Sequence, residues 1–253
     1  MFKKIAVAVI AVAVIAIAAQ AEAFRPMVTD DASVVPAYAL GVEPSFRYNE
    51  NLVRQDNVAR FGITNWLQAS AGFSWGRSIL DNVKNHWGVF LPMLELKAVI
   101  MEPITDGVPG FAVVVGSYLP YGTDELRTNI WQQWAYVAAT EKLFQDSLIV
   151  SVNFGAMMKE PKAGNVDVHA VETWGVGAQY KIYGGLNVLG EIFSGNRMTG
   201  FEGGAWQGGL RYVFNDKVAI DAFVGKGIWG RNGMTKEPLW VGAGLTVTTA
   251  SLW

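Results

Sequence analysis

Residues 173–181 read TWGVGAQYK, and this short stretch carries the pattern that decides the fold. Trp174, Val176, Ala178 and Tyr180 occupy every second position, with Thr, Gly, Gly, Gln and Lys between them. Successive side chains of a β-strand point to opposite faces. The stretch therefore predicts a strand with one apolar face and one face of glycine and polar residues. The glycines of the polar face either leave space beside the strand or serve its curvature.

The same alternation recurs along the chain, with turn residues between the segments. It is clear in 37–48, 66–75, 89–101, 147–156, 205–213 and 239–248, and four further segments, 110–119, 129–140, 186–194 and 218–225, are also expected to be strands. One more segment, 53–61, alternates poorly and carries Arg54, Asp56 and Arg60. Repeated alternating segments of about ten residues are typical of transmembrane barrels. We therefore predict an all-β fold, an antiparallel up-and-down β-barrel of about 12 strands over 37–253.

Composition agrees with a membrane barrel and excludes several other classes. The chain has 253 residues, 28 glycines, no cysteine and a formal net charge of −2, and its mean hydropathy is +0.22. The small net charge gives no basis for nucleic acid as a partner, and disulfides or thiolate metal sites are impossible. The alternative is a soluble barrel or sandwich with an aromatic core. It is less favoured because the faces opposite the aromatic residues carry Gly, Gln, Glu and Arg.

The N-terminus reads MFKKIAVAVIAVAVIAIAAQAEA and is typical of a secretory signal peptide. Lys3 and Lys4 precede an apolar run over 5–19, and Ala21-Glu22-Ala23 places small residues before a cleavage site. An uncleaved anchor is the alternative, but the run is shorter than the roughly 20 residues that span a bilayer. We predict a signal peptide over 1–23, and hence export to the outer membrane of a Gram-negative cell, with membrane lipids as partners.

Residues 24–36 lie between the signal peptide and the first strand, and they contain Asp30 and Asp31. This N-terminal segment could fold into the lumen and pair with Arg47 or Arg211. It could equally be a hydrated periplasmic tail, and the sequence leaves both possibilities open.

The polar faces of the strands predict which side chains point into the lumen. They are Glu43, Arg47, Glu95, Lys97, Gln133, Gln179, Lys181, Glu191, Gln207, Arg211 and Asp221. Charged groups inside a barrel must be paired or hydrated. They could line a pore that selects solutes, or they could form a bridged network that braces the wall, which is the more common role for any single residue.

Several stretches resemble a known family. RPMVTDDA at 25–32, FGITNWLQASAGFSW at 61–75, VGSYLPYG at 115–122, GGLRYVFNDKVAIDAFVG at 208–225 and LWVGAGLTV at 239–247 are similar to the outer-membrane transporters named for the MetA pathway of phenol degradation. The resemblance implies a barrel and the passage of small organic solutes. Trp253 departs from the Phe that is commoner at the end of such barrels.

Three functions follow as hypotheses. The leading one is a passive channel for a small-molecule solute, with hydrophobic or aromatic compounds as candidates. The second is a closed structural or surface-interaction barrel that acts through 157–172 or 226–238. The third is a barrel enzyme that uses His169 with Glu172, although a lone loop histidine is usually solvated, as for His86. No catalytic residue, metal site or cofactor is predicted, and the oligomeric state is open.

Overall fold

A computed structural model describes residues 26–79, 87–122, 131–159, 169–196, 201–231 and 236–252. The predicted signal peptide and Trp253 lie outside these residues. Within them the chain forms β-strands, turns and irregular segments, and no helix is long and apolar enough to cross a bilayer. The strands are β1 (Leu40–Asn49), β2 (Leu52–Gly62), β3 (Leu67–Ser78), β4 (Gly88–Met101), β5 (Gly110–Tyr118), β6 (Gln132–Leu143), β7 (Leu148–Lys159), β8 (His169–Tyr183), β9 (Leu186–Asn196), β10 (Phe201–Asn215), β11 (Val218–Trp229) and β12 (Trp240–Thr248).

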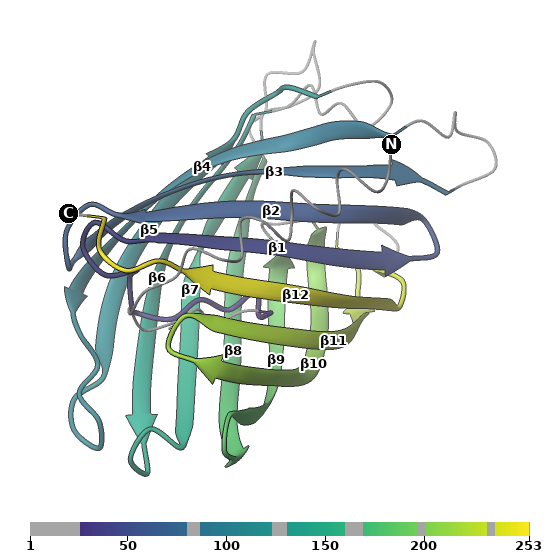
Figure 1. The fold of residues 1–253 in the computed structure, drawn as a ribbon. Helices are drawn as coiled ribbons and strands as arrows, with labels where there is room; N and C mark the ends of the chain where they lie inside the picture. Colours follow the sequence, from purple (N-terminus) through teal and green to yellow (C-terminus); the bar gives the residue numbers. More distant parts are fainter. Residues whose placement is uncertain are drawn as a thin grey trace, which may run out of the picture.

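The strands form one closed antiparallel barrel (Figure 1). Each strand pairs with the next one along the chain, and β1 pairs with β12 from Gly41↔Thr248 to Asn49↔Trp240. The predicted 12-strand barrel is therefore confirmed. The poorly alternating segment 53–61 is the full-length strand β2, which pairs continuously with β3 from Leu52 to Gly62.

Strand ends differ from the prediction at a few places. β1 begins at Leu40 rather than at 37, because Tyr38 has a left-handed backbone (φ 61°) that ends the extended run. β8 and β10 each begin four residues earlier than expected, at His169 and Phe201. Their extra residues pair with neighbouring strands beyond the stretch in which apolar and polar residues alternate clearly, so hydropathy alone did not mark them.

Two ends of the barrel can be distinguished. The short-turn end carries the connections 63–66, 144–147, 184–185 and 216–217, and the loop end carries the longer connections, except for the short 50–51. The short-turn end also carries the connection 102–109, which is longer than its other turns. Asp106 fixes it there, since its carboxylate accepts from the backbone N–H groups of Phe144 (2.6 Å) and Gln145 (2.9 Å).

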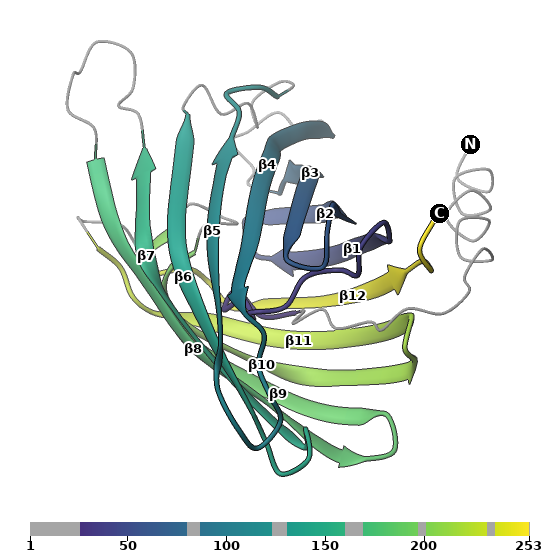
Figure 2. The same cartoon turned by 90° about the vertical axis from the view of Figure 1, so that its left-hand side faces the viewer.

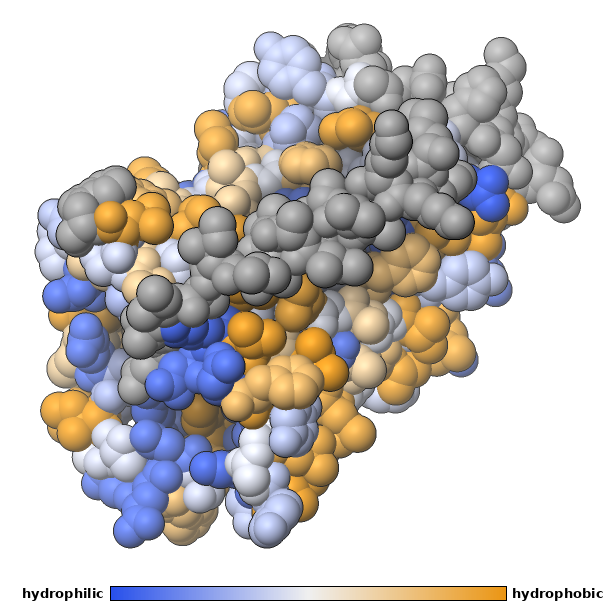
Figure 3. Space-filling model, viewed as in Figure 1, coloured by the Kyte–Doolittle hydropathy of each residue, from blue (hydrophilic) through white to orange (hydrophobic). Residues whose placement is uncertain are grey.

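The outer wall is apolar and the inner wall is polar. Leu94, Val115 and Phe154 are exposed on the outside, whereas Glu43, Lys97 and their counterparts on other strands are buried inside. Figure 3 shows apolar side chains spread over the wall, with hydrophilic ones gathered toward the lower left, where turns lie in Figure 1. A sheet with no free edge satisfies its backbone internally, which is what a hydrocarbon environment requires.

Residues 26–36, here called the inner segment, run through the space that the strands enclose (purple in Figures 1 and 2). The segment has no strand partner of its own, apart from one bridge just after it between Ala37 and Gly62. Ala32 of the segment is fully buried in a cluster with Val58, Met93 and Val114 of the barrel wall. The segment therefore packs against the wall and fills part of the lumen.

Candidate functional site

The inner segment is held mainly by side chains of the barrel wall. Glu191 on β9 accepts from the backbone N–H groups of Val28 (2.7 Å) and Thr29 (2.8 Å). Gln207 on β10 donates to the carbonyl of Pro26 (2.7 Å), and Trp240 on β12 donates its indole N–H to Gln207 (2.9 Å). One carboxylate and one amide thus satisfy the first residues of the segment.

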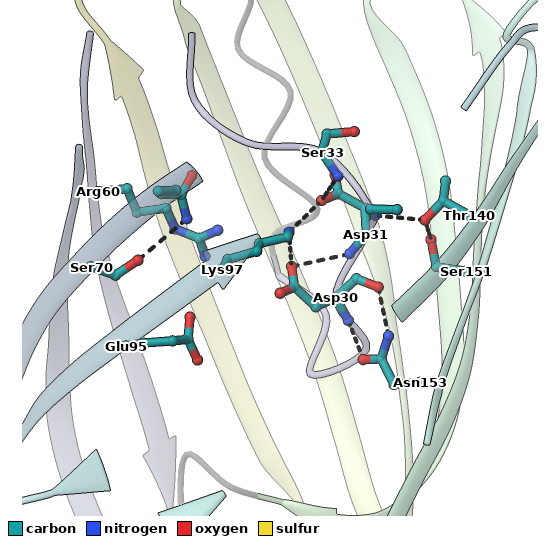
Figure 4. A network of polar contacts seen from close by, with 12 residues as sticks. Asp30, Asp31, Ser33, Arg60, Ser70, Glu95, Lys97, Thr140, Ser151 and Asn153 are labelled. Atoms are coloured by element: carbon teal, nitrogen blue, oxygen red, sulfur yellow. Dashed lines mark hydrogen bonds and ion pairs between the residues drawn. The ribbon is translucent and has the colours of Figure 1, made fainter. Parts of the chain in front are cut away.

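Farther along, wall residues of β6 and β7 hold the middle of the segment (Figure 4). Asn153 accepts from the Asp30 N–H (2.6 Å) and donates to the Asp30 carbonyl (2.8 Å). The Thr140 hydroxyl accepts from the Ala32 N–H (2.9 Å) and shares a hydrogen bond with Ser151 (2.7 Å). These polar groups of the wall replace the water that the backbone would bind in solution.

The last part of the inner segment is also held by a side chain of the wall, and it leads to the short-turn end. Val35 N–H donates to Gln68 Oε1 (2.9 Å) on β3. Beside it lies a cavity of about 420 Å³ whose lining includes Ser33, Val34, Val99 and Lys142. The barrel is therefore hollow beside the segment at its short-turn end.

An ionic cluster anchors the centre of the segment. Lys97 Nζ on β4 lies 3.1 Å from Asp30 Oδ1 and 2.9 Å from Asp31 Oδ1, and the Tyr136 hydroxyl donates to Asp30 Oδ2 (2.8 Å). The Lys97 side chain is only 1% exposed. Burial raises the pKa of the Asp31 carboxyl above its ordinary value, against the opposing attraction of Lys97. Two carboxylates beside one cation leave a local excess of negative charge, which also favours protonation.

The predicted partners of the two aspartates were wrong. Arg47 forms an ion pair with Glu237 and lies 4.1 Å from the centroid of the Trp240 ring. Arg211 on β10 lies directly opposite Asp221 on β11 in the strand register. Arg47 is thus engaged by Glu237 and Trp240, and Lys97 on β4 holds the aspartates instead.

Other charges of the inner wall pair within a strand or between neighbouring strands. Arg60 on β2 lies 3.0 Å from Glu43 on β1, and Arg54 lies 3.1 Å from Asp56 within β2. Burial raises the pKa of Glu237 in spite of the nearby Arg47. The Arg60–Glu43 pair joins β2 to β1, and the Arg47–Glu237 pair joins β1 to the connection before β12.

The structure places most of the predicted lumen side chains in the interior. Buried there are Glu43, Arg47, Glu95, Lys97, Glu191, Gln207, Arg211 and Asp221. Gln179 is half-buried, 3.5 Å from Asn187, and Lys181 is exposed near the end of β8.

Gln133 was assigned to the wrong face. It is exposed on the outside of β6, and Gln132 is buried instead. The reason is that Trp134 and Tyr136 turn inward, where the Trp134 indole donates to Glu95 Oε2 (3.0 Å) and Tyr136 donates to Asp30. Trp134 and Tyr136 therefore point inward although they are largely apolar, because each has a polar atom that is hydrogen-bonded inside the barrel.

The interior has an aromatic lining that the sequence pattern did not predict. It consists of Tyr118, Trp134, Tyr136, Phe193 and Trp240, all nearly fully buried. The Tyr118 and Trp134 ring centroids are 5.0 Å apart. Alternation alone placed aromatic residues on the lipid side. The only signal in the sequence is that Trp and Tyr can satisfy a polar atom inside a polar lumen.

Glycines of β8 make room for the inner segment. A Cβ on Gly175 would lie 2.5 Å from Thr29 Oγ1, and one on Gly177 would lie 3.0 Å from Met27 Sδ. Contacts this short require the Thr29 and Met27 side chains to turn away, or the segment to move, before a larger residue fits. The glycine face of the decisive stretch 173–181 therefore accommodates a piece of the same chain.

The residues of the enzyme hypothesis do not form a visible site. His86 lies outside the described residues. His169 is the first residue of β8, and the structure does not describe its side chain. Glu172 is exposed and forms an ion pair with Arg231. In the described parts of the chain, no group of three or more His, Asp or Glu side chains is placed to hold a metal ion.

Comparison with solved structures finds barrels of the same architecture. The COG4313 outer membrane channel from Pseudomonas putida F1 superimposes with a TM-score of 0.61 at 12% identity, covering 86% of this chain and 98% of that one. The KdgM porin in complex with disordered oligogalacturonate gives 0.57 at 10% identity, with 82% and 98% covered. The NanC porin gives 0.54 at 11% identity, with 83% and 99% covered. At these identities the likeness concerns the fold.

Comparison with curated proteins finds no match. Comparison with sequence families does, and the match covers residues 11–249, which include all twelve strands. The chain therefore belongs to the family described as uncharacterised conserved protein UCP029691.

Proposed function

We propose that this protein is an outer-membrane channel for small solutes, narrowed by the inner segment. One observation carries the proposal: the segment that occupies the lumen is held mainly by side-chain hydrogen bonds and one ionic cluster, not by strand pairing. Such contacts can be released without opening the wall. The structural likeness to barrels described as a channel and as porins supports the same reading.

The solutes that fit best are small and apolar or aromatic. The aromatic lining is nearly fully buried while the inner segment is docked, and Val28 of the segment packs against Phe193 and Trp240, so release of the segment would open flat apolar surfaces to a solute. The indole of Trp134 and the hydroxyl of Tyr136 are engaged with Glu95 and Asp30. A solute passing them meets ring faces more than free hydrogen-bonding groups. The resemblance to the transporters named for the MetA pathway points to the same class of solute.

We also propose that residues 1–23 are removed on export and that the short-turn end faces the periplasm. In bacterial barrels the periplasmic turns are short and the external loops long. The inner segment would then enter the lumen from the periplasmic side. N-terminal sequencing of protein purified from outer membranes tests the cleavage, with Phe24 as the expected first residue.

Reconstitution tests the channel. In planar bilayers the native protein is expected to give small conductance steps, and a variant lacking residues 26–36 is expected to give larger ones. Liposomes containing either protein are then compared for uptake of a neutral aromatic alcohol and of a sugar of similar mass. Absence of conductance and of uptake above empty liposomes in both variants would leave only the closed structural barrel.

A further inference from the structure

Away from the strand ends, where Gln133 on β6 is exposed, the outer wall of the described residues is interrupted by polar side chains on β2. Along this strand Arg54, Asp56 and Val58 are buried inside, so Gln55 and Asn57 point outward. This is why the segment alternates poorly in the sequence: its charged residues face the lumen, and two of its outward positions carry amides.

The two amides lie at mid-height of the wall. Asn57 is the central residue of β2 and sits opposite Pro44 on β1 and Phe73 on β3. Gln55 sits between Phe46 and Trp75 in the same register. Their neighbours Phe46, Phe73 and Trp75 are exposed as on the rest of the membrane-facing wall.

The amides satisfy only part of their hydrogen-bonding capacity. Gln55 Nε2 donates to Asn57 Oδ1 (2.9 Å). The Gln55 carbonyl, its second N–H and both N–H groups of Asn57 have no partner among the described residues. Polar groups left unbonded in hydrocarbon are costly, and acyl chains offer neither donor nor acceptor.

We propose that the outward face of β1–β3 binds a second copy of this chain, with Gln55 and Asn57 bonding across the contact. A two-fold contact brings the same patch together with itself, and amides are self-complementary because each carries donors and an acceptor. Small residues beside them, Ala59, Ala69 and Ala71, allow two walls to approach closely.

A hollow in the outer wall extends from Ala69 on β3 across β4 and β5 to β6 and β7. It measures about 620 Å³, opens to the outside, and its lining includes Ala69, Leu94, Leu96 and Val115. It begins one strand away from the amides, so the amides and not the hollow carry the proposed contact.

Cysteine cross-linking tests the contact, because the native chain contains no cysteine. Ala71→Cys lies beside the amides, opposite Ala59, and leaves them intact. Val137→Cys, exposed on the outside of β6, is the matched control. In native outer membranes under mild oxidation, we expect a disulfide-linked dimer with Ala71→Cys and only background with Val137→Cys.

The amides are tested by adding Gln55→Leu and Asn57→Leu to Ala71→Cys. We expect the cross-linked fraction to fall about tenfold, from the loss of hydrogen bonds within the membrane. Heat-modifiable migration on gels checks that every variant is folded. Equal cross-linking at 71 and 137, or a cross-link at 71 that the leucines leave unchanged, would overturn the proposal, and a lipid contact would give the first of these results.

Discussion

Asn153 and Asp30 exchange two hydrogen bonds, as two paired strand residues would. The Asp30 N–H donates to Asn153 Oδ1 at 2.6 Å, and Asn153 Nδ2 donates to the Asp30 carbonyl at 2.8 Å. A side-chain amide on β7 thus serves as the backbone partner of an irregular segment. Because one side chain supplies both bonds, a single substitution can release the centre of the inner segment.

Asn153→Leu is expected to loosen the inner segment. It leaves the buried N–H and C=O of Asp30 without Asn153, at a cost of roughly 1–3 kcal/mol for each unsatisfied group. If the docked and released segments interconvert, the open fraction rises by about tenfold for each 1.4 kcal/mol. Single-channel recording measures this open fraction. Asn187→Leu is the control, since Asn187 bonds to the Gly185 carbonyl and not to the segment; an equal effect of both substitutions would contradict the assignment.

Lys97→Met is expected to release the segment more strongly. It removes the cation that lies within 3.1 Å of both Asp30 and Asp31, and breaking a buried pair in this way costs about 3–5 kcal/mol. The readout is maleimide labelling of Thr29→Cys, because Thr29 is only 1% exposed in the docked segment. We expect fast labelling with Lys97→Met and slow labelling without it.

Charge removal on the segment supplies the control for this prediction. Adding Asp30→Asn and Asp31→Asn to Lys97→Met removes the uncompensated negative charge, so labelling should slow again. If the triple variant labels as fast as Lys97→Met alone, Lys97 acts through packing and not through charge.

The sequence predicted the barrel well because its determining signal is local. Side chains two residues apart along a strand face the same environment, so each strand shows its own alternation of apolar and polar residues. Twelve such weak patterns together predict the barrel. β2 was the weakest because its charges face the lumen while Gln55 and Asn57 face outward. The strand was nevertheless real, since pairing with β1 and β3 determines it.

The interior was less predictable because it depends on contacts between distant residues. Lys97 and Asp31 are 66 positions apart in the chain, and Glu191 and Val28 are 163 apart. Alternation gives the face of a side chain and not its partner. It also fails where an aromatic residue has a polar partner inside, as Trp134 does, and this is why Gln133 was placed on the wrong face.

Gly175→Ala is expected to displace the inner segment without removing any hydrogen bond. The new Cβ would lie 2.5 Å from Thr29 Oγ1 and 3.4 Å from Thr29 Cβ, so the Thr29 side chain must turn or the segment must shift. We expect larger or more frequent conductance steps. Gly190→Ala on the neighbouring strand is the control, because a Cβ there meets nothing closer than 3.9 Å. Identical conductance of the two variants would show that the segment is not confined by β8.

Acidification is expected to favour the docked segment. Burial raises the pKa of Asp31 above its ordinary value of 3.8 in the docked state, whereas a released, hydrated Asp31 titrates at the ordinary value. Between these two values the docked state binds more protons, so lowering the pH stabilises it, and raising the pH through the higher value weakens it. Conductance should therefore fall as the pH is lowered toward the ordinary value of 3.8. Asp31→Asn, which cannot titrate, should flatten this dependence. Conductance that rises on acidification, or a fall that persists unchanged in Asp31→Asn, would place the titrating group elsewhere.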